Sequence, residues 1–104
     1  NVSDKAISIG EQSNTFIENN NIYNSNIGIA IKDGSNAKII NSNIYESKFA
    51  DIMSYNKKSF FGSSFTNISS MHQNLSIKIQ KGNEAILNGE KIFTQKINVK
   101  QLYN

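Results

Sequence analysis

The chain repeats itself with a period of 22 residues. Residues 5–26 (KAISIGEQSNTFIENNNIYNSN) and 27–48 (IGIAIKDGSNAKIINSNIYESK) align without a gap, and 10 of the 22 positions are identical. Such a period is typical of solenoids, in which each repeat forms one coil and stacked coils share a core. The identical pairs are Ile7/Ile29, Ile9/Ile31, Ser13/Ser35, Asn14/Asn36, Ile17/Ile39, Asn19/Asn41, Asn21/Asn43, Ile22/Ile44, Tyr23/Tyr45 and Ser25/Ser47.

Within each copy the apolar residues alternate with polar ones, as in Ile7 and Ile9. A period of two over short runs indicates strands with one buried face. The runs are separated by GEQSN, ENNN, KDGSN and INSN, which read as turns. The chain has 17 Asn and no Pro, and Asn suits turns because it tolerates left-handed backbone angles. We therefore expect about three strands per coil, each pairing in parallel with its equivalent in the next coil.

A third copy, residues 49–70, is degenerate, and a fourth near 71–92 keeps only Leu75, Ile77 and Ile79. In the third copy Asp51 takes the place of Ile29, and a one-residue bulge would put Ile52 there instead. The rival 22-residue solenoid, the leucine-rich repeat, is disfavoured because the chain has only three Leu. Aligned without a gap, Met53 falls under Ile31, Phe61 under Ile39, Ser63 under Asn41, Tyr55 under Asp33 and Ser69 under Ser47.

The pattern changes again after residue 70. Asn88-Gly89 stands between apolar runs and predicts a hairpin, and Ile97 and Val99 alternate beyond it. A terminal repeat has to cover the end of the core and the open strand edges. We predict β-helix coils over residues 1–70 and a C-terminal cap over 71–104, forming one domain that is a fragment of a larger protein.

Composition excludes several classes of function. The formal net charge is only +3, and all 11 basic residues are Lys. Bidentate readout of bases and phosphates prefers Arg, so we expect no nucleic-acid partner. No apolar run reaches the roughly 18 residues of a membrane span. There is no Cys, and His72 is the only His, so we expect no metal site of thiolate or imidazole type.

Residues 22 positions apart should lie about 4.8 Å apart in a stack of parallel strands. Asn19 with Asn41, and Asn21 with Asn43, are then expected to form internal amide ladders that stabilise the turns. Tyr23 and Tyr45 follow buried Ile residues and should point outward. They are candidates for a sugar-binding platform, and a purely structural aromatic ladder is the alternative.

Charged residues supply the remaining candidates. Glu11 and Asp33 should stack at the end of the first strand, where they could perform acid/base chemistry or bind calcium, with Lys32 beside them. A solvated acidic edge is the simpler interpretation, because Tyr55 ends the column. Lys57 and Lys58 could meet an acidic polysaccharide or serve as solubilising loop charges.

The stretch from Ala6 to Ser47 resembles the pectate-lyase-like, right-handed parallel β-helix repeat proteins of bacteria and phages, and YNKKSFFG resembles a motif near the C-terminal end of such helices. The resemblance implies an all-β fold: a right-handed, single-stranded parallel β-helix of about three to four coils with a C-terminal hairpin cap. That superfamily includes polysaccharide lyases, hydrolases, tailspikes and non-catalytic stalks, so the fold does not select an activity.

We expect a non-catalytic structural or carbohydrate-binding module of a larger secreted or cell-surface protein. The alternatives are a fragment of a polysaccharide lyase or hydrolase, with Glu11, Asp33 and Lys32 as its catalytic candidates, and a phage tail-fibre or tailspike segment. The expected partners are a polysaccharide or surface glycan, the rest of the parent protein and, for a tailspike, further copies of the chain.

Overall fold

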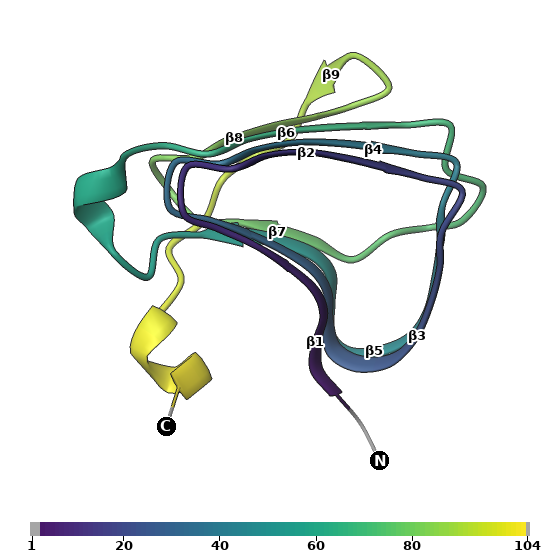
Figure 1. Ribbon diagram of the computed structural model, residues 1–104, viewed down its shortest axis with the longest axis horizontal. Coiled ribbons are helices and arrows are strands. Elements are labelled where there is room, and N and C mark those ends of the chain that lie inside the picture. The colour runs from purple at the N-terminus through teal and green to yellow at the C-terminus, as the bar shows by residue number, and fades with distance from the viewer. Residues whose placement is uncertain (1–2, 104) are drawn as a thin grey trace.

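The computed structural model describes residues 3–103 and shows a β-solenoid of about four turns (Figure 1). Two sheets wind around the axis, with strand orders β1-β3-β5-β7 and β2-β4-β6-β8-β9, and all their pairs except β8–β9 are parallel. This confirms the predicted parallel β-helix. The strands are β1 (Ser3–Ile9), β2 (Asn14–Glu18), β3 (Asn21–Lys32), β4 (Asn36–Ile40), β5 (Asn43–Tyr55), β6 (Phe65–Ser69), β7 (Ile77–Ile79), β8 (Glu84–Leu87) and β9 (Glu90–Lys91).

The first two coils stack in the predicted 22-residue register. Ile7 pairs with Ile29 in one sheet and Ile17 with Ile39 in the other. Each coil has two strands rather than three, because the last predicted strand of one copy runs through a bend into the first strand of the next (Figure 1). Gly28 lies in this bend, where an added Cβ would meet the Asp51 carbonyl oxygen at 2.5 Å. Only glycine lets the neighbouring strand approach so closely.

The inner core consists mainly of stacked isoleucines, as the alternation predicts. Ile39 is completely buried between Ile17 of the coil before and Ile68 of the coil after. Burial of such aliphatic side chains is the main stabilising contribution that this architecture can offer. The inner cluster comprises Ile9, Ile17, Ile22, Ile29, Ile31, Ala37, Ile39, Ile44, Ile52 and Ile68.

The third coil is longer than the first two. The predicted one-residue bulge is present and pairs Ile52 with Ile29, 23 residues apart. The offset then rises to 29 between Asn36 and Phe65, so six further residues enter the coil. They form a protruding turn with a 3-10 helix, η1 (Ser59–Phe61).

The bulge and this insertion together make the gapless alignment of the third copy wrong. The bulge shifts the pairing of residues 50–55 by one, and the insertion shifts the residues after it by six more. Met53 pairs with Ala30 and Tyr55 with Lys32, while Ser54 lies under Ile31. Ile68, not Phe61, pairs with Ile39, and Ser69 pairs with Ile40 rather than lying under Ser47. Ser63 does not lie under Asn41, whose backbone N–H instead donates to the Ser69 carbonyl.

A second apolar cluster lies on the outer face of the β3–β5 sheet. Ile27, Ala30, Ala50, Met53 and Tyr55 are all buried there. They are covered by the C-terminal segment, through Ile97, Val99 and Leu102. The alternation of Ile97 and Val99 therefore marks a covering segment, which ends in a 3-10 helix, η2 (Val99–Tyr103), and not in a strand.

The predicted hairpin is confirmed. β8 and β9 pair antiparallel around Asn88 and Gly89, whose φ angles of 51° and 83° suit a type I′ turn. β7 and β8 still pair in parallel with β5 and β6, so a fourth coil continues past residue 70. The predicted boundary between 1–70 and 71–104 stays a prediction, and its residues 1–2 and 104 lie outside the described range. Within residues 3–103, no helix is long and apolar enough to cross a membrane.

Candidate functional site

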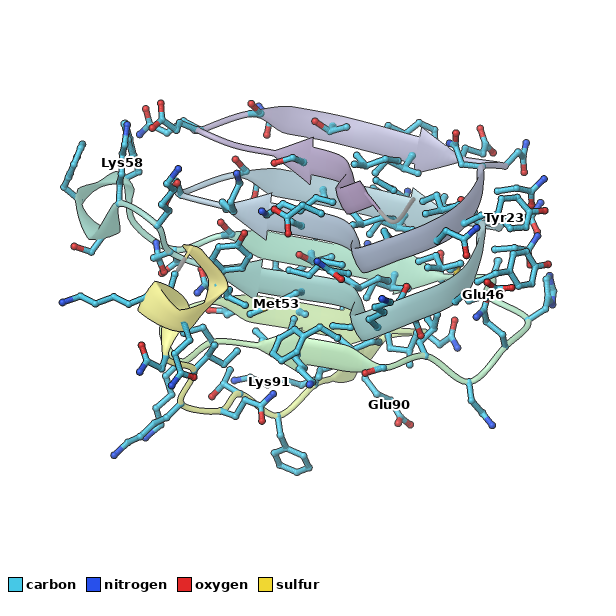
Figure 2. The ribbon with its side chains drawn as sticks, turned by 90° about the horizontal axis from the view of Figure 1, so that it is seen from below. Tyr23, Glu46, Met53, Lys58, Glu90 and Lys91 are labelled. Atoms are coloured by element: carbon cyan, nitrogen blue, oxygen red, sulfur yellow. The ribbon has the colours of Figure 1, made fainter. Side chains whose placement is uncertain are left out.

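Tyr23 and Tyr45 form an exposed aromatic stack on the outer surface. β3 and β5 place the two residues directly opposite each other. Their ring centroids are 5.0 Å apart with an interplanar angle of 22°, and the residues are 58% and 42% exposed. Figure 2 shows Tyr23 at one end of the coil, pointing away from the sheets. Because each ring partly covers one face of the other, each ring keeps its outer face, its edges and its phenol hydroxyl for contact with a ligand.

The tyrosine stack cannot extend to a third coil. The Gln73 side chain takes the place of a paired strand beneath Ile44: its Oε1 accepts from the Ile44 N–H at 2.8 Å and its Nε2 donates to the Ile44 carbonyl at 2.7 Å. The amide therefore satisfies the backbone where the neighbouring coil departs from the sheet. The aromatic site consists of two rings.

The predicted asparagine ladders flank this stack. Asn43 Nδ2 donates to Asn21 Oδ1 at 3.0 Å, and Asn41 Nδ2 donates to Asn19 Oδ1 at 2.6 Å. Asn19 and Asn41 also have left-handed φ angles of 58° and 48°. Both expected pairs are hydrogen-bonded, but Asn19, Asn21 and Asn41 are exposed, so the pairs lie on the surface and not in the interior.

A third ladder joins Asn36 Nδ2 to Asn14 Oδ1 at 3.1 Å. Sequence reasoning missed it, although both residues belong to an identical pair of the repeat and could have been found there. A column of serines joins the coils in the same way. Ser13 N–H donates to the buried Ser35 Oγ and Ser35 N–H donates to the buried Ser64 Oγ, both at 3.1 Å.

The expected solvated acidic edge is wrong for Asp33, which is only 2% exposed. Its Oδ1 accepts the backbone N–H groups of Lys57 at 2.8 Å and Lys58 at 2.7 Å. Glu11 lies outside it, and its Oε2 is 2.8 Å from Lys58 Nζ. Hydrogen bonding to Glu11 raises the pKa of Lys58. The two carboxylates thus hold the inserted turn from two sides.

Lys32 is half-buried next to this cluster. Burial lowers the pKa of its ammonium group, and the neighbouring charges of Lys5 and Lys57 lower it further. Lys32 pairs with the buried Tyr55. The gapless alignment placed Tyr55 under Asp33, and the bulge shifts it by one residue.

The predicted ligand-binding residues therefore separate into two groups. Lys58 and Tyr23 lie at opposite ends of the coil in Figure 2. Among the described residues no three His, Cys, Asp or Glu side chains gather in a way that could hold a metal ion. Calcium at Glu11 and Asp33 stays a prediction.

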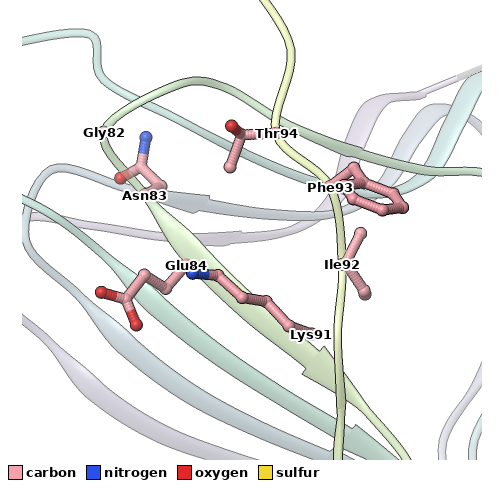
Figure 3. A pocket seen from close by; sticks show the side chains of 7 residues that line it. All are labelled: Gly82, Asn83, Glu84, Lys91, Ile92, Phe93 and Thr94. Atoms are coloured by element: carbon pink, nitrogen blue, oxygen red, sulfur yellow. The ribbon is translucent and has the colours of Figure 1, made fainter.

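One surface hollow was not predicted. It has a volume of about 630 Å³ and lies beside the hairpin, where the chain returns from β9 past β8 (Figure 3). The Glu84 and Lys91 side chains lie along one wall, and Phe93 is 96% exposed at its rim. This hollow forms because of the path that the chain takes after the hairpin, and no local sequence pattern predicts that path.

No family model, curated protein or solved structure matches this chain. The pectate-lyase-like resemblance therefore extends only to the architecture, a β-solenoid of about four turns with parallel sheets.

Proposed function

We propose that the chain is a non-catalytic β-solenoid module that binds carbohydrate through Tyr23 and Tyr45, within a larger secreted or cell-surface protein. The observation that carries this proposal is the exposed, parallel stack of two rings held in register by paired strands. Aromatic faces pack against the apolar C–H faces of sugars, while phenol and amide groups offer hydrogen bonds to hydroxyls. Asn21 and Asn43, two residues before each ring, supply such amides.

The rigidity of this site favours binding. Each tyrosine follows a buried isoleucine, Ile22 or Ile44, and lies on a strand that is hydrogen-bonded to its neighbour. Rings that are already fixed lose little conformational freedom when a ligand packs on them. The site is thus organised before any ligand arrives.

Catalysis is the less supported alternative, because the two candidate carboxylates already bind other groups of the chain. Asp33 is buried and its Oδ1 already accepts two backbone N–H groups. Glu11 pairs with Lys58. A general acid or base has to reach a proton on the substrate, and these contacts direct both carboxylates toward the inserted turn instead.

Isothermal titration against a panel of neutral and acidic oligosaccharides tests the proposal. We expect Tyr23→Ala and Tyr45→Ala each to weaken binding by about tenfold, equivalent to about 1.4 kcal/mol. Tyr23→Phe separates the ring from the hydroxyl. Phe60→Ala is the matched control, because Phe60 is also an exposed ring but lies on the inserted turn. Binding that is unchanged in both alanine variants, or absent for every glycan, would contradict the proposal.

A further inference from the structure

A groove crosses the outer face of the β3–β5 sheet beside the C-terminal segment. Two hollows of about 380 and 290 Å³ adjoin there and share Phe49, Gln101 and Leu102. Hollows near this size are typical of sites for small ligands. We call this feature the outer groove and define it by Phe49, Lys78, Lys96, Asn98, Gln101 and Leu102.

The wall of the outer groove is anchored to the solenoid. Gln95 N–H donates to the Ile79 carbonyl at 2.8 Å, and Lys81 N–H donates to the Gln95 carbonyl at 2.9 Å. Beyond them Ile97, Val99 and Leu102 pack on the outer apolar cluster. The groove therefore exists without a ligand, because packing and backbone bonds hold both of its sides.

The larger hollow is positively charged. Lys78 and Lys96 line it together with the amides of Gln95, Asn98 and Gln101, and no carboxylate does. Asp4, which lines the smaller hollow, pairs with Lys5, and Lys58 pairs with Glu11. Among the described residues neither Lys78 nor Lys96 forms such an ion pair. Amides and ammonium groups together suit a carboxylate or sulfate group.

Phe49 fixes the position of one of these charges. Lys78 Nζ lies 3.8 Å from the centroid of the Phe49 ring, which is 41% exposed. A cation over an aromatic face is attracted to it while its other donors stay available. Lys78 is opposite Met53 in the sheet register, and the ring holds its ammonium group in the hollow.

We infer that the outer groove binds the anionic group of an acidic polysaccharide, with Lys78 and Lys96 as the charge-recognising residues. The choice of a polysaccharide over an acidic peptide rests on the proposed function, whereas the anion specificity rests on the groove alone. The outer groove is distinct from the Tyr23–Tyr45 stack, because neither tyrosine lines either of its two hollows. A chain that touches both would gain affinity from the sugar face at one site and from charge at the other.

The test uses an oligosaccharide of alternating glucuronate and N-acetylglucosamine, its carboxyl-reduced form and an oligoglutamate of similar length. Affinity is measured by titration for the parent chain, Lys78→Gln, Lys96→Gln and the control Lys38→Gln, whose lysine lies over Phe16 on the other sheet. We expect each groove variant to lose about tenfold in affinity for the acidic sugar and Lys38→Gln to lose none. Affinity should also fall as salt rises. Circular dichroism melts confirm that the variants are folded.

The outcomes separate the two proposals. If the acidic and the carboxyl-reduced sugars bind equally and only the tyrosine variants weaken them, the outer groove inference is wrong and the proposed function stands. If the acidic sugar binds through Lys78 and Lys96 while the tyrosine variants change nothing, the groove is correct and the proposed function fails. Equal or tighter binding of the oligoglutamate at the same lysines would overturn the polysaccharide assignment.

Discussion

The first two coils and the third coil differ in the side-chain hydrogen bonds that join them to their neighbours. Between the first two, identical side chains lie 22 residues apart and bond directly, as Asn41 does to Asn19 and Asn43 to Asn21. Around the third coil, unlike side chains satisfy the backbone. Asp33 accepts from the inserted turn and Gln73 pairs with Ile44. Repetition stabilises the regular coils, and individual polar contacts stabilise the irregular one.

This difference has a functional consequence. The regular turns place equivalent side chains in columns, which is how Tyr23 and Tyr45 become a stack. The irregular coil and the tail create concave features, including the outer groove at Lys78 and Lys96. A flat repeat supplies an ordered surface, and departures from it supply hollows where a ligand can be enclosed.

The largest effect is expected where both kinds of coil share the core. Ile39 is fully buried and packs between Ile17 and Ile68, so its position joins the regular coils to the irregular one. We expect Ile39→Ala to lower the free energy of unfolding by about 2–5 kcal/mol, as for other buried aliphatic truncations. Urea denaturation followed by circular dichroism measures it. Ile40→Ala is the matched control. Ile40 is the next residue in β4, and because its side chain is only half-buried, its truncation should cost clearly less.

The second prediction concerns the irregular coil alone. Asp33→Ala should cost about 1.5–3 kcal/mol, the usual value for hydrogen bonds to a charged group, because it removes the acceptor of two backbone N–H groups. Asp33 also has a left-handed φ of 56°, which Asn tolerates but which strains alanine, so part of the cost of Asp33→Ala is conformational. Asp33→Asn keeps an acceptor oxygen and should retain most of the stability. Hydrogen exchange at Lys57 and Lys58 provides a local readout.

A clear result would locate the effect in the turn. Faster exchange at Lys57 and Lys58 in Asp33→Ala, with protection unchanged in β2 and β4, is expected. If Asp33→Asn proved as damaging as Asp33→Ala, the negative charge itself would be essential, and the catalytic or calcium-binding interpretation of this carboxylate would regain support.

The sequence predicts the regular coils better than the irregular coil and the tail. The parallel register, the inner isoleucines, the tyrosine stack and the Asn88-Gly89 hairpin follow from a period and from local turn chemistry. The number of strands per coil does not, because β3 and β5 each join two predicted strands through a bend. The six-residue insertion was missed because a gapless alignment cannot show where a coil lengthens, and so Phe61 was placed where Ile68 lies. The outer groove was missed because it depends on where residues 95–102 cross the sheet, a long-range outcome without local signal.

The smallest effects on stability are expected for single hydrogen bonds of the asparagine ladders. They separate two roles of Asn, its left-handed backbone conformation and its side-chain hydrogen bond. Asn41 bonds to Asn19 and has a φ of 48°, whereas Asn36 bonds to Asn14 within a regular strand. Loss of one rung should cost about 0.5–1.5 kcal/mol in either place. Asn41→Ala should cost about 1–2 kcal/mol more than that, because alanine is strained in the left-handed region. Thermal melts of Asn41→Ala and Asn36→Ala measure the difference.

Asn41→Gly then decides between conformation and hydrogen bonding. Glycine adopts the left-handed angle without steric cost but cannot form the rung, and it adds about 0.5–1 kcal/mol of unfolded-state entropy. If backbone conformation dominates, Asn41→Gly will be more stable than Asn41→Ala. If the two variants are equally destabilised, the amide ladder itself sets the value of the position. In that case the repeated Asn pairs would be retained for the bonds that join one coil to the next, and Asn14 and Asn36 should prove as sensitive as Asn19 and Asn41.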